Sequence, residues 1–266
     1  MVDPAPVFGS DIATNYNRYL VPLIFDRYAA ELATNVAAEG HQRVLEIACG
    51  TGAVTQHLVS RLGDARVIAT DINPGMLDIA KTHIEQTEHL AFQVADGTDL
   101  PFEDAHFDAV VCQFGVMFYP DKDKGYSEAL RVLKPGGRFH FTVWDSLEHN
   151  ALAQLVHEAS RSVSTELTFM TKPYGYCDVS EIKSSLERVG FQGMEISVQP
   201  RFSEAGSAAE VVLGLVDGSP LSAELAAAGL LNEGRDAVQA ALHTRYGTGS
   251  VSAPMQAIRF SASKSS

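Results

Sequence analysis

A glycine-rich turn holds the residues with the clearest chemical potential. Residues 44–52 read VLEIACGTG, a short apolar run that ends in small residues at Ala48, Gly50 and Gly52. Small residues let a ligand approach the backbone closely, and the helix predicted after the turn offers free N–H groups and a positive dipole end. The turn therefore suits a carboxylate or a phosphate, although a plain strand-to-helix turn that favours glycine would read similarly.

Two acids follow the next two predicted strands. Asp71 lies 19 residues after Gly52, and an acid at the tip of a second strand can accept hydrogen bonds from both ribose hydroxyls. Asp96 follows the third strand, where its carboxylate could bind an adenine amine while a backbone N–H meets a ring nitrogen. Asp71 could also cap the helix that begins near Pro74, and Asp96 with Gly97 could form an ordinary turn. Together the acids and the glycines favour a nucleoside ligand.

NAD and S-adenosylmethionine (SAM) both carry such a nucleoside. The turn reads A-x-G-x-G rather than the G-x-G-x-x-G of dinucleotide sites, and Glu46 stands two residues ahead of Ala48. An acid there would repel a pyrophosphate but attract an ammonium group. We therefore favour SAM, and a nucleotide-dependent oxidoreductase remains the alternative.

The first half of the chain alternates strand and helix patterns, which implies a parallel sheet with right-handed crossovers. Strands are predicted at 43–48, 66–70, 91–95, 107–114, 138–144, 191–198 and 255–262, and helices at 11–35, 55–62, 74–85, 125–133, 180–189, 207–215, 222–231 and 235–246. The residues 134–137, read as KPGG, are expected to end a helix. The predicted fold class is α/β: a doubly wound, mostly parallel seven-stranded Rossmann-like sheet with helical cap elements.

These elements divide the chain into four predicted regions. Residues 1–40 form an N-terminal helical cap, and residues 41–145 form the SAM-binding core. Residues 146–180 form a lid or substrate segment. Residues 181–266 complete the sheet and carry a helical insertion near 203–254.

Five ordered segments resemble a known family. VLEIACGTG, ATDINPGML, ADGTDLPF, FDAVVCQFGVMFYPD and RVLKPGGRF occur in that order. Together they resemble the class I SAM-dependent methyltransferases, and within them the type 11 group, which is related to the quinone-biosynthesis C-methyltransferases. The resemblance spans roughly residues 41–145. The segment YNRYL, which contains Tyr16 and Tyr19, more weakly resembles the helix that covers the cofactor in this group, and the two tyrosines are expected on one helical face.

The resemblance implies a binding site for SAM and for its product S-adenosylhomocysteine. The methionine end of the cofactor would contact Glu46, Ala48, Gly50 and Gly52, and the ribose would contact Asp71. The adenine would contact Ile72, Met76, Asp96 and Gly97, and the sulfonium would lie near Gln113 and Phe114. The helix that covers the cofactor would contribute Tyr16 and Tyr19. Glu46 stands where Asp is commoner and Ala48 where Gly is commoner, so the added methyl group of Ala48 narrows the approach to the backbone.

The acceptor side is less defined. Candidates for acceptor contacts are Tyr119, His149, Phe169, Tyr174 and Tyr176, and each could instead serve packing or lie in solvent. Because methyl transfer needs a general base only for a protonated acceptor, no catalytic residue is assigned. His140, inside the fifth strand, reads as a buried histidine with satisfied hydrogen bonds, and no metal site is expected.

Composition narrows the class of protein. The chain has 266 residues, 20 basic and 33 acidic, with a net charge of −13, which disfavours nucleic-acid or anionic-membrane partners. No apolar run reaches membrane-helix length, and the N-terminus does not resemble a signal peptide. Three cysteines without paired spacing are typical of reduced thiols, so a cytoplasmic location is expected. The predicted partner is a small-molecule acceptor; a nucleic-acid methyltransferase and a non-catalytic SAM-binding protein remain rivals.

Overall fold

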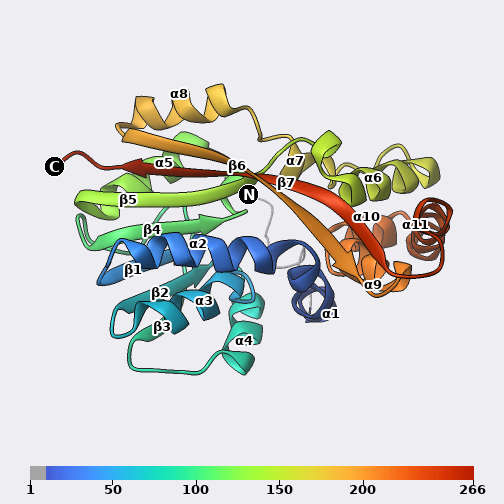
Figure 1. Ribbon diagram of the computed structural model, residues 1–266, viewed down its shortest axis with the longest axis horizontal. Helices are drawn as coiled ribbons and strands as arrows, with labels where there is room; N and C mark the ends of the chain where they lie inside the picture. The colour runs from blue at the N-terminus through green and yellow to red at the C-terminus, as the bar shows by residue number, and fades with distance from the viewer. Residues whose placement is uncertain (1–9) are drawn as a thin grey trace.

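A single sheet of seven strands organises the chain in the computed structural model, which describes residues 10–266. Its strand order is β3-β2-β1-β4-β5-β7-β6 (Figure 1), and only β7 runs antiparallel to its neighbours. The strands are β1 Arg43–Ile47, β2 Arg66–Asp71, β3 Leu90–Val94, β4 Phe107–Gln113, β5 Leu133–Trp144, β6 Gln192–Ala205 and β7 Val251–Ser263. The predicted α/β class and mostly parallel sheet are confirmed.

Helices cover both faces of the sheet because its central strands are apolar on both sides. One face packs against α2 Asp26–Ala38, α3 Ala53–Leu62 and α4 Pro74–His83, and the other against α5 Lys122–Val132 and α8 Val179–Val189. The helix starts follow capping chemistry: the side chain of Asn73 accepts a hydrogen bond from the Gly75 N–H at 2.9 Å, one residue before Pro74. These layers fix the strand ends on which a ligand site depends.

A third apolar cluster lies beyond the ends of the parallel strands. It joins the π-helix η2 Tyr16–Phe25 to α6 Ala151–Val163, α9 Ala208–Val212, the π-helix η5 Leu213–Asp217, α10 Leu221–Ala227 and α11 Leu231–Tyr246. Figure 1 shows α6, α9, α10 and α11 gathered around the far end of the long β6–β7 ribbon. The short elements α1 Ser10–Asn15, η3 Val116–Phe118, η4 Leu147–His149 and α7 Thr171–Tyr174 complete the fold.

Strands β6 and β7 are longer than the sequence analysis predicted. β6 and β7 remain paired as far as Ala205 and Val251, so the helical insertion spans only 206–250. The reason is an inverted burial pattern: Val198 and Phe202 are more than half exposed, whereas Gln199 and Ser203 are buried. Gln199 is buried because its amide donates to Glu31 Oε1 of α2 at 2.7 Å. Hydrophobic alternation alone does not reveal such a strand.

Two other sequence expectations change. Helix α5 does end just before residues 134–137, at Val132, but these residues are not a loop: they belong to β5, where its pairing with β4 shifts register and the Gly136 N–H donates to the Lys264 carbonyl at 3.1 Å. The segment 146–180 contains the 13-residue helix α6, which was not predicted as a helix and packs on α11. No described helix is long and apolar enough to cross a membrane.

The N-terminal region has two parts with different packing. The predicted cap begins with residues 1–9, which lie outside the described part of the chain. Helix α2 is a full member of the helical layer, since Ala29, Leu32 and Val36 are completely or almost completely buried against the sheet side. Among the described N-terminal residues, only α1 and η2 therefore remain available as a cover over the strand ends.

Candidate functional site

Asp71 ties the glycine turn to the neighbouring strand. Its Oδ2 accepts the Gly50 N–H and its Oδ1 accepts the Asn73 N–H, both at 2.8 Å. Burial raises the pKa of Asp71 above its ordinary value, while backbone N–H groups partly oppose that rise. The carboxylate predicted to hold a ribose thus also shapes the turn, and each oxygen retains a further lone pair for a ligand hydroxyl.

The two glycines of the turn are needed for different reasons. A Cβ on Gly50 would lie 3.6 Å from the Tyr16 hydroxyl, in ordinary contact across the crevice, whereas a Cβ on Gly52 would lie 2.3 Å from Ile84 Cδ1. Both glycines have positive φ, 56° and 87°. Gly50 therefore lets the backbone lie buried directly beneath the Tyr16 ring, and Gly52 allows α3 to start close beside the end of α4.

Ala48 carries backbone strain in the same turn. Its φ is 55°, a left-handed conformation that costs a residue with a Cβ about 1–2 kcal/mol. We expect Ala48→Gly to raise the free energy of unfolding by about 0.5–1 kcal/mol, once the extra chain entropy of glycine is subtracted. Urea unfolding measures the difference. Ala240→Gly, in the exposed middle of α11, is the control and should lower stability by about 1 kcal/mol; equal losses in both variants would contradict the strain.

Glu46 is buried at the end of β1. It is 1% exposed, and the Thr55 hydroxyl donates to its Oε2 at 2.6 Å. Burial raises the pKa of Glu46 to about 8, against the opposing effect of the Thr55 hydrogen bond. A carboxyl poised near neutral pH is a feature of ligand sites, and an arriving ammonium group would favour its ionised form.

Tyr16 and Tyr19 do not share a face. The Tyr16 ring reaches over Gly50, and burial followed by the charge of Asp71 raises its pKa. Tyr19 instead lines a surface hollow of about 560 Å³ with Arg18, whose guanidinium carbon lies 5.1 Å from the Tyr19 ring centroid. The cause is the π-helical geometry of η2, because a turn with i→i+5 hydrogen bonds rotates residues three apart away from each other.

The predicted adenine side has one open apolar side chain. Ile72, next to Asp71, is 46% exposed, whereas Met76 is buried. Asp96 Oδ1 accepts the backbone N–H of Thr98 at 2.8 Å and its hydroxyl at 2.9 Å. A Cβ on Gly97 would meet the Tyr119 hydroxyl at 2.6 Å. Asp96 therefore forms its turn and still offers its second oxygen, and Gly97 is required by packing.

Aromatic rings line the predicted sulfonium end. Phe114, with φ 53°, stacks on Trp144 with ring centroids 4.0 Å apart, and Phe25 and Tyr28 pack against both rings. Beside them Gln113 donates to the Phe25 carbonyl at 3.4 Å. The Gln113 Oε1 atom is buried and has no hydrogen-bond partner among the described residues. An orphaned acceptor within an aromatic wall fits a cationic ligand group.

The proposed acceptor residues are scattered. Tyr174 packs on Trp144 with centroids 5.7 Å apart, so α7 does reach the end of β5. The Tyr176 hydroxyl bonds that of Tyr126 at 3.0 Å, and Tyr119 is buried beside Cys112. Phe169 packs against the third apolar cluster, which joins η2 to α6 and α9–α11. His149 is exposed, with its Nδ1 3.1 Å from the Ser146 hydroxyl.

Sequence reasoning missed three residues of the aromatic wall: Phe25, Tyr28 and Trp144. Trp144 had a usable signal, because it is the only tryptophan of the chain and ends the fifth strand. Phe25 and Tyr28 had none, since their place in the wall depends on how η2 and α2 cross the strand ends.

Comparisons with known proteins agree with this geometry. A family model described as a methyltransferase domain matches residues 44–137. The demethylmenaquinone methyltransferase of Clavibacter sepedonicus is 42% identical over 103 residues, which cover 39% of this chain and 41% of the relative. The demethylmenaquinone methyltransferase of Bacteroides fragilis is 30% identical over 173 residues, which cover 58% of this chain and 69% of the relative.

The sequence match covers only part of the first curated relatives, whereas the structural match covers most of the fold. The chain spans less than half the length of the first curated relatives it matches, between 38% and 44%. The solved structure of a methyltransferase candidate from Bacillus halodurans matches with a TM-score of 0.60 at 19% identity, over 90% of this chain and 99% of that chain, which supports the fold alone. Since the Bacteroides relative is matched over more than two thirds of its length, and the family model spans the glycine turn, Asp71 and Asp96, the chain belongs to the class I SAM-dependent methyltransferases and resembles their quinone-biosynthesis members.

Proposed function

We propose that this protein transfers a methyl group from SAM to a small apolar acceptor at the carboxyl ends of β1, β2 and β4. The arrangement of Asp71, Gly50 and Tyr16 carries the proposal: a buried carboxylate accepts the Gly50 N–H and holds the glycine turn beneath the Tyr16 ring. The orphaned Gln113 Oε1 supports the same ligand, because a buried acceptor without a partner calls for a donor or a cation. The remaining predicted cofactor residues are proposed in the same roles, except Tyr19, which lines a separate surface hollow.

The aromatic residues at the ends of β4 and β5 indicate the chemical class of the methyl acceptor. Phe25, Phe114 and Trp144 form a buried aromatic cluster at the ends of β4 and β5, and such a cluster beside the proposed site suits a planar apolar ring. Two relatives are named for demethylmenaquinone, so we propose a reduced quinone-type ring as the first acceptor class to test. The net charge of −13 argues against a nucleic-acid substrate. Three free cysteines support a cytoplasmic location.

The residues act by position rather than by covalent catalysis. SAM, when bound, supplies a methyl group on a sulfonium, which is a good leaving group. Asp71 and the glycine turn fix the ligand, and the aromatic wall orients the acceptor for in-line attack and excludes water. His149, exposed near the end of β5, is the proposed base for an acceptor that arrives protonated.

Binding and turnover test the proposal together. We expect SAM and S-adenosylhomocysteine to raise the melting temperature, since ligand at 100 times its Kd adds about 2.7 kcal/mol of stability. NAD at the same concentration is the matched control and should cause no shift. With a demethylated quinol in detergent, S-adenosylhomocysteine should accumulate only when acceptor and protein are both present. A shift with NAD alone would support an oxidoreductase, and binding without turnover across acceptor classes would indicate a non-catalytic SAM-binding protein.

The cover should respond to the ligand. Because the Tyr16 ring lies against Gly50, a ligand on the turn must displace or lie beside that ring, and we expect S-adenosylhomocysteine to slow hydrogen exchange in residues 10–25. Helix α2 is already packed in the core, so its exchange should change much less. Hydrogen exchange with mass spectrometry measures both segments. Equal changes in the cover and in α2 would show that the N-terminal segment is ordinary scaffold.

A further inference from the structure

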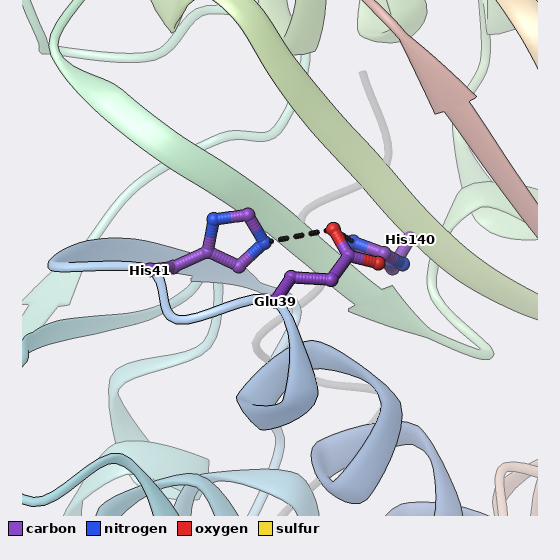
Figure 2. Close-up of side chains that lie close together, drawn as sticks. All are labelled: Glu39, His41 and His140. Atoms are coloured by element: carbon purple, nitrogen blue, oxygen red, sulfur yellow. Dashed lines mark hydrogen bonds and ion pairs between the residues drawn. The ribbon is translucent and has the colours of Figure 1, made fainter.

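Three potential metal ligands converge where α2 ends. Glu39 caps the end of α2, His41 follows in the turn to β1, and His140 comes from β5. Figure 2 shows the Glu39 carboxylate between the two imidazole rings. Glu39 Oε2 lies 3.1 Å from His41 Nε2 and 3.6 Å from His140 Nε2, and one ligand atom from each residue lies within 4.8 Å of the others.

His140 supplies an independent sign that a partner belongs here. The residue is 1% exposed, its Nδ1 has no hydrogen-bond partner among the described residues, and its Nε2 has only the 3.6 Å ion-pair contact with Glu39, which is too long for a hydrogen bond. This corrects the expectation of a satisfied buried histidine. Ser261 lies opposite His140 in the β5–β7 pairing, on the same face, and its buried hydroxyl also lacks a partner. Such unpaired buried groups are rare unless a water or an ion completes them.

The surrounding charges are compatible with a cation. Glu39 uses its other oxygen, Oε1, toward Arg138 at 3.4 Å, which leaves Oε2 for the histidines, and Arg138 also pairs with Glu195 at 2.7 Å. Arg259 lies two residues from Ser261 along β7, and its buried Nε has no hydrogen-bond partner among the described residues, whereas Asp108 adds negative charge near His41. The carboxyl end of a helix such as α2, 13 residues long, carries a partial negative charge that favours a cation.

We propose that Glu39, His41 and His140 bind one divalent transition metal of the zinc type. Two imidazoles and one carboxylate match the donors that zinc accepts, with bonds of about 2.0–2.1 Å and hence ligand atoms about 3.4 Å apart in a tetrahedron. Two of the three separations are already near that value. The site lies at the opposite end of α2 from Tyr28, which packs in the aromatic wall. The metal clamps the α2–β1 turn to β5, and the site is independent of the proposed methyl transfer.

The test is metal binding by the full chain, produced without a histidine tag and stripped with a chelator. Isothermal titration with Zn²⁺ should give one site per chain, and Co²⁺ should give the strong visible absorption of a four-coordinate site. Glu39→Gln, His41→Ala and His140→Ala should each weaken binding by at least tenfold. His243→Ala, an exposed histidine on α11, is the matched control and should bind as the parent does.

Two outcomes would overturn the site. The first is no saturable Zn²⁺ binding by the folded parent chain. The second is unchanged binding in both Glu39→Gln and His41→Ala, which would place the metal elsewhere, for example on the thiols. Circular dichroism monitors folding, and because Glu39 and His41 lie in a surface turn, these two variants decide the question even if His140→Ala fails to fold.

Discussion

Replacing Asp71 with asparagine is expected to weaken SAM binding by at least tenfold. In the folded chain both carboxylate oxygens face groups that need an acceptor, the N–H groups of Gly50 and Asn73 at 2.8 Å. An asparagine keeps one acceptor oxygen but turns an NH₂ donor toward one of these N–H groups. It also removes the charge from hydrogen bonds to the ribose, each worth about 1.5–3 kcal/mol, and about 1.4 kcal/mol corresponds to tenfold in affinity.

This variant also tests whether the hydrogen bonds of Asp71 stabilise the glycine turn. Because a buried N–H without an acceptor costs about 1–3 kcal/mol, Asp71→Asn should lower the free energy of unfolding as well. Titration calorimetry measures affinity, and urea unfolding without ligand measures stability. Asp64→Asn, at an exposed acid before β2, is the control and should change neither. Lower stability with unchanged SAM affinity would make Asp71 a structural residue alone.

Replacing Glu46 with glutamine is expected to make the protein more stable at alkaline pH. The pKa of Glu46 in the folded state is raised from 4.5 to about 8, chiefly by burial. The folded chain therefore holds this proton more tightly than the unfolded chain does. The contribution of Glu46 to stability is full below pH 4.5 and is lost as the pH rises from 4.5 to about 8.

The size of this effect follows from the shift. Each unit of pKa corresponds to about 1.4 kcal/mol, so the loss by pH 8 is on the order of 4 kcal/mol. Glutamine stays neutral and can still accept the Thr55 hydrogen bond, so the two proteins should be similarly stable at about pH 5 and diverge at higher pH. Urea unfolding without ligand at acidic, neutral and alkaline pH measures the divergence. Glu85→Gln, at an exposed acid, is the control, and parallel pH profiles for the parent and Glu46→Gln would refute the assignment.

The sequence by itself determined the sheet core and its ligand end. The glycine turn, Asp71 and Asp96 each lie directly after a short apolar run, and the carboxyl ends of parallel strands meet at one edge. Local periodicity therefore sufficed to locate the first five strands, which pair in parallel as predicted. The A-x-G-x-G turn with Glu46 favoured SAM over NAD, and the family resemblance, carried by the order of the motifs, supported the same ligand.

Tertiary structure decided the roles that depend on distant contacts. Gly52 is required because Ile84 lies where its Cβ would be, and Tyr16 covers Gly50 while Tyr19 turns away because η2 is a π-helix. The pairing of β6 with β7 continues beyond the end of β5, as far as Ala205 and Val251.

The grouping of Glu39 and His41 with His140 arises in the same way, because a turn and a strand far apart in the chain are brought together. A sequence pattern records which side of its own element a residue occupies. It does not record which element packs against that side, and that packing settles whether a buried polar group such as His140 finds a partner.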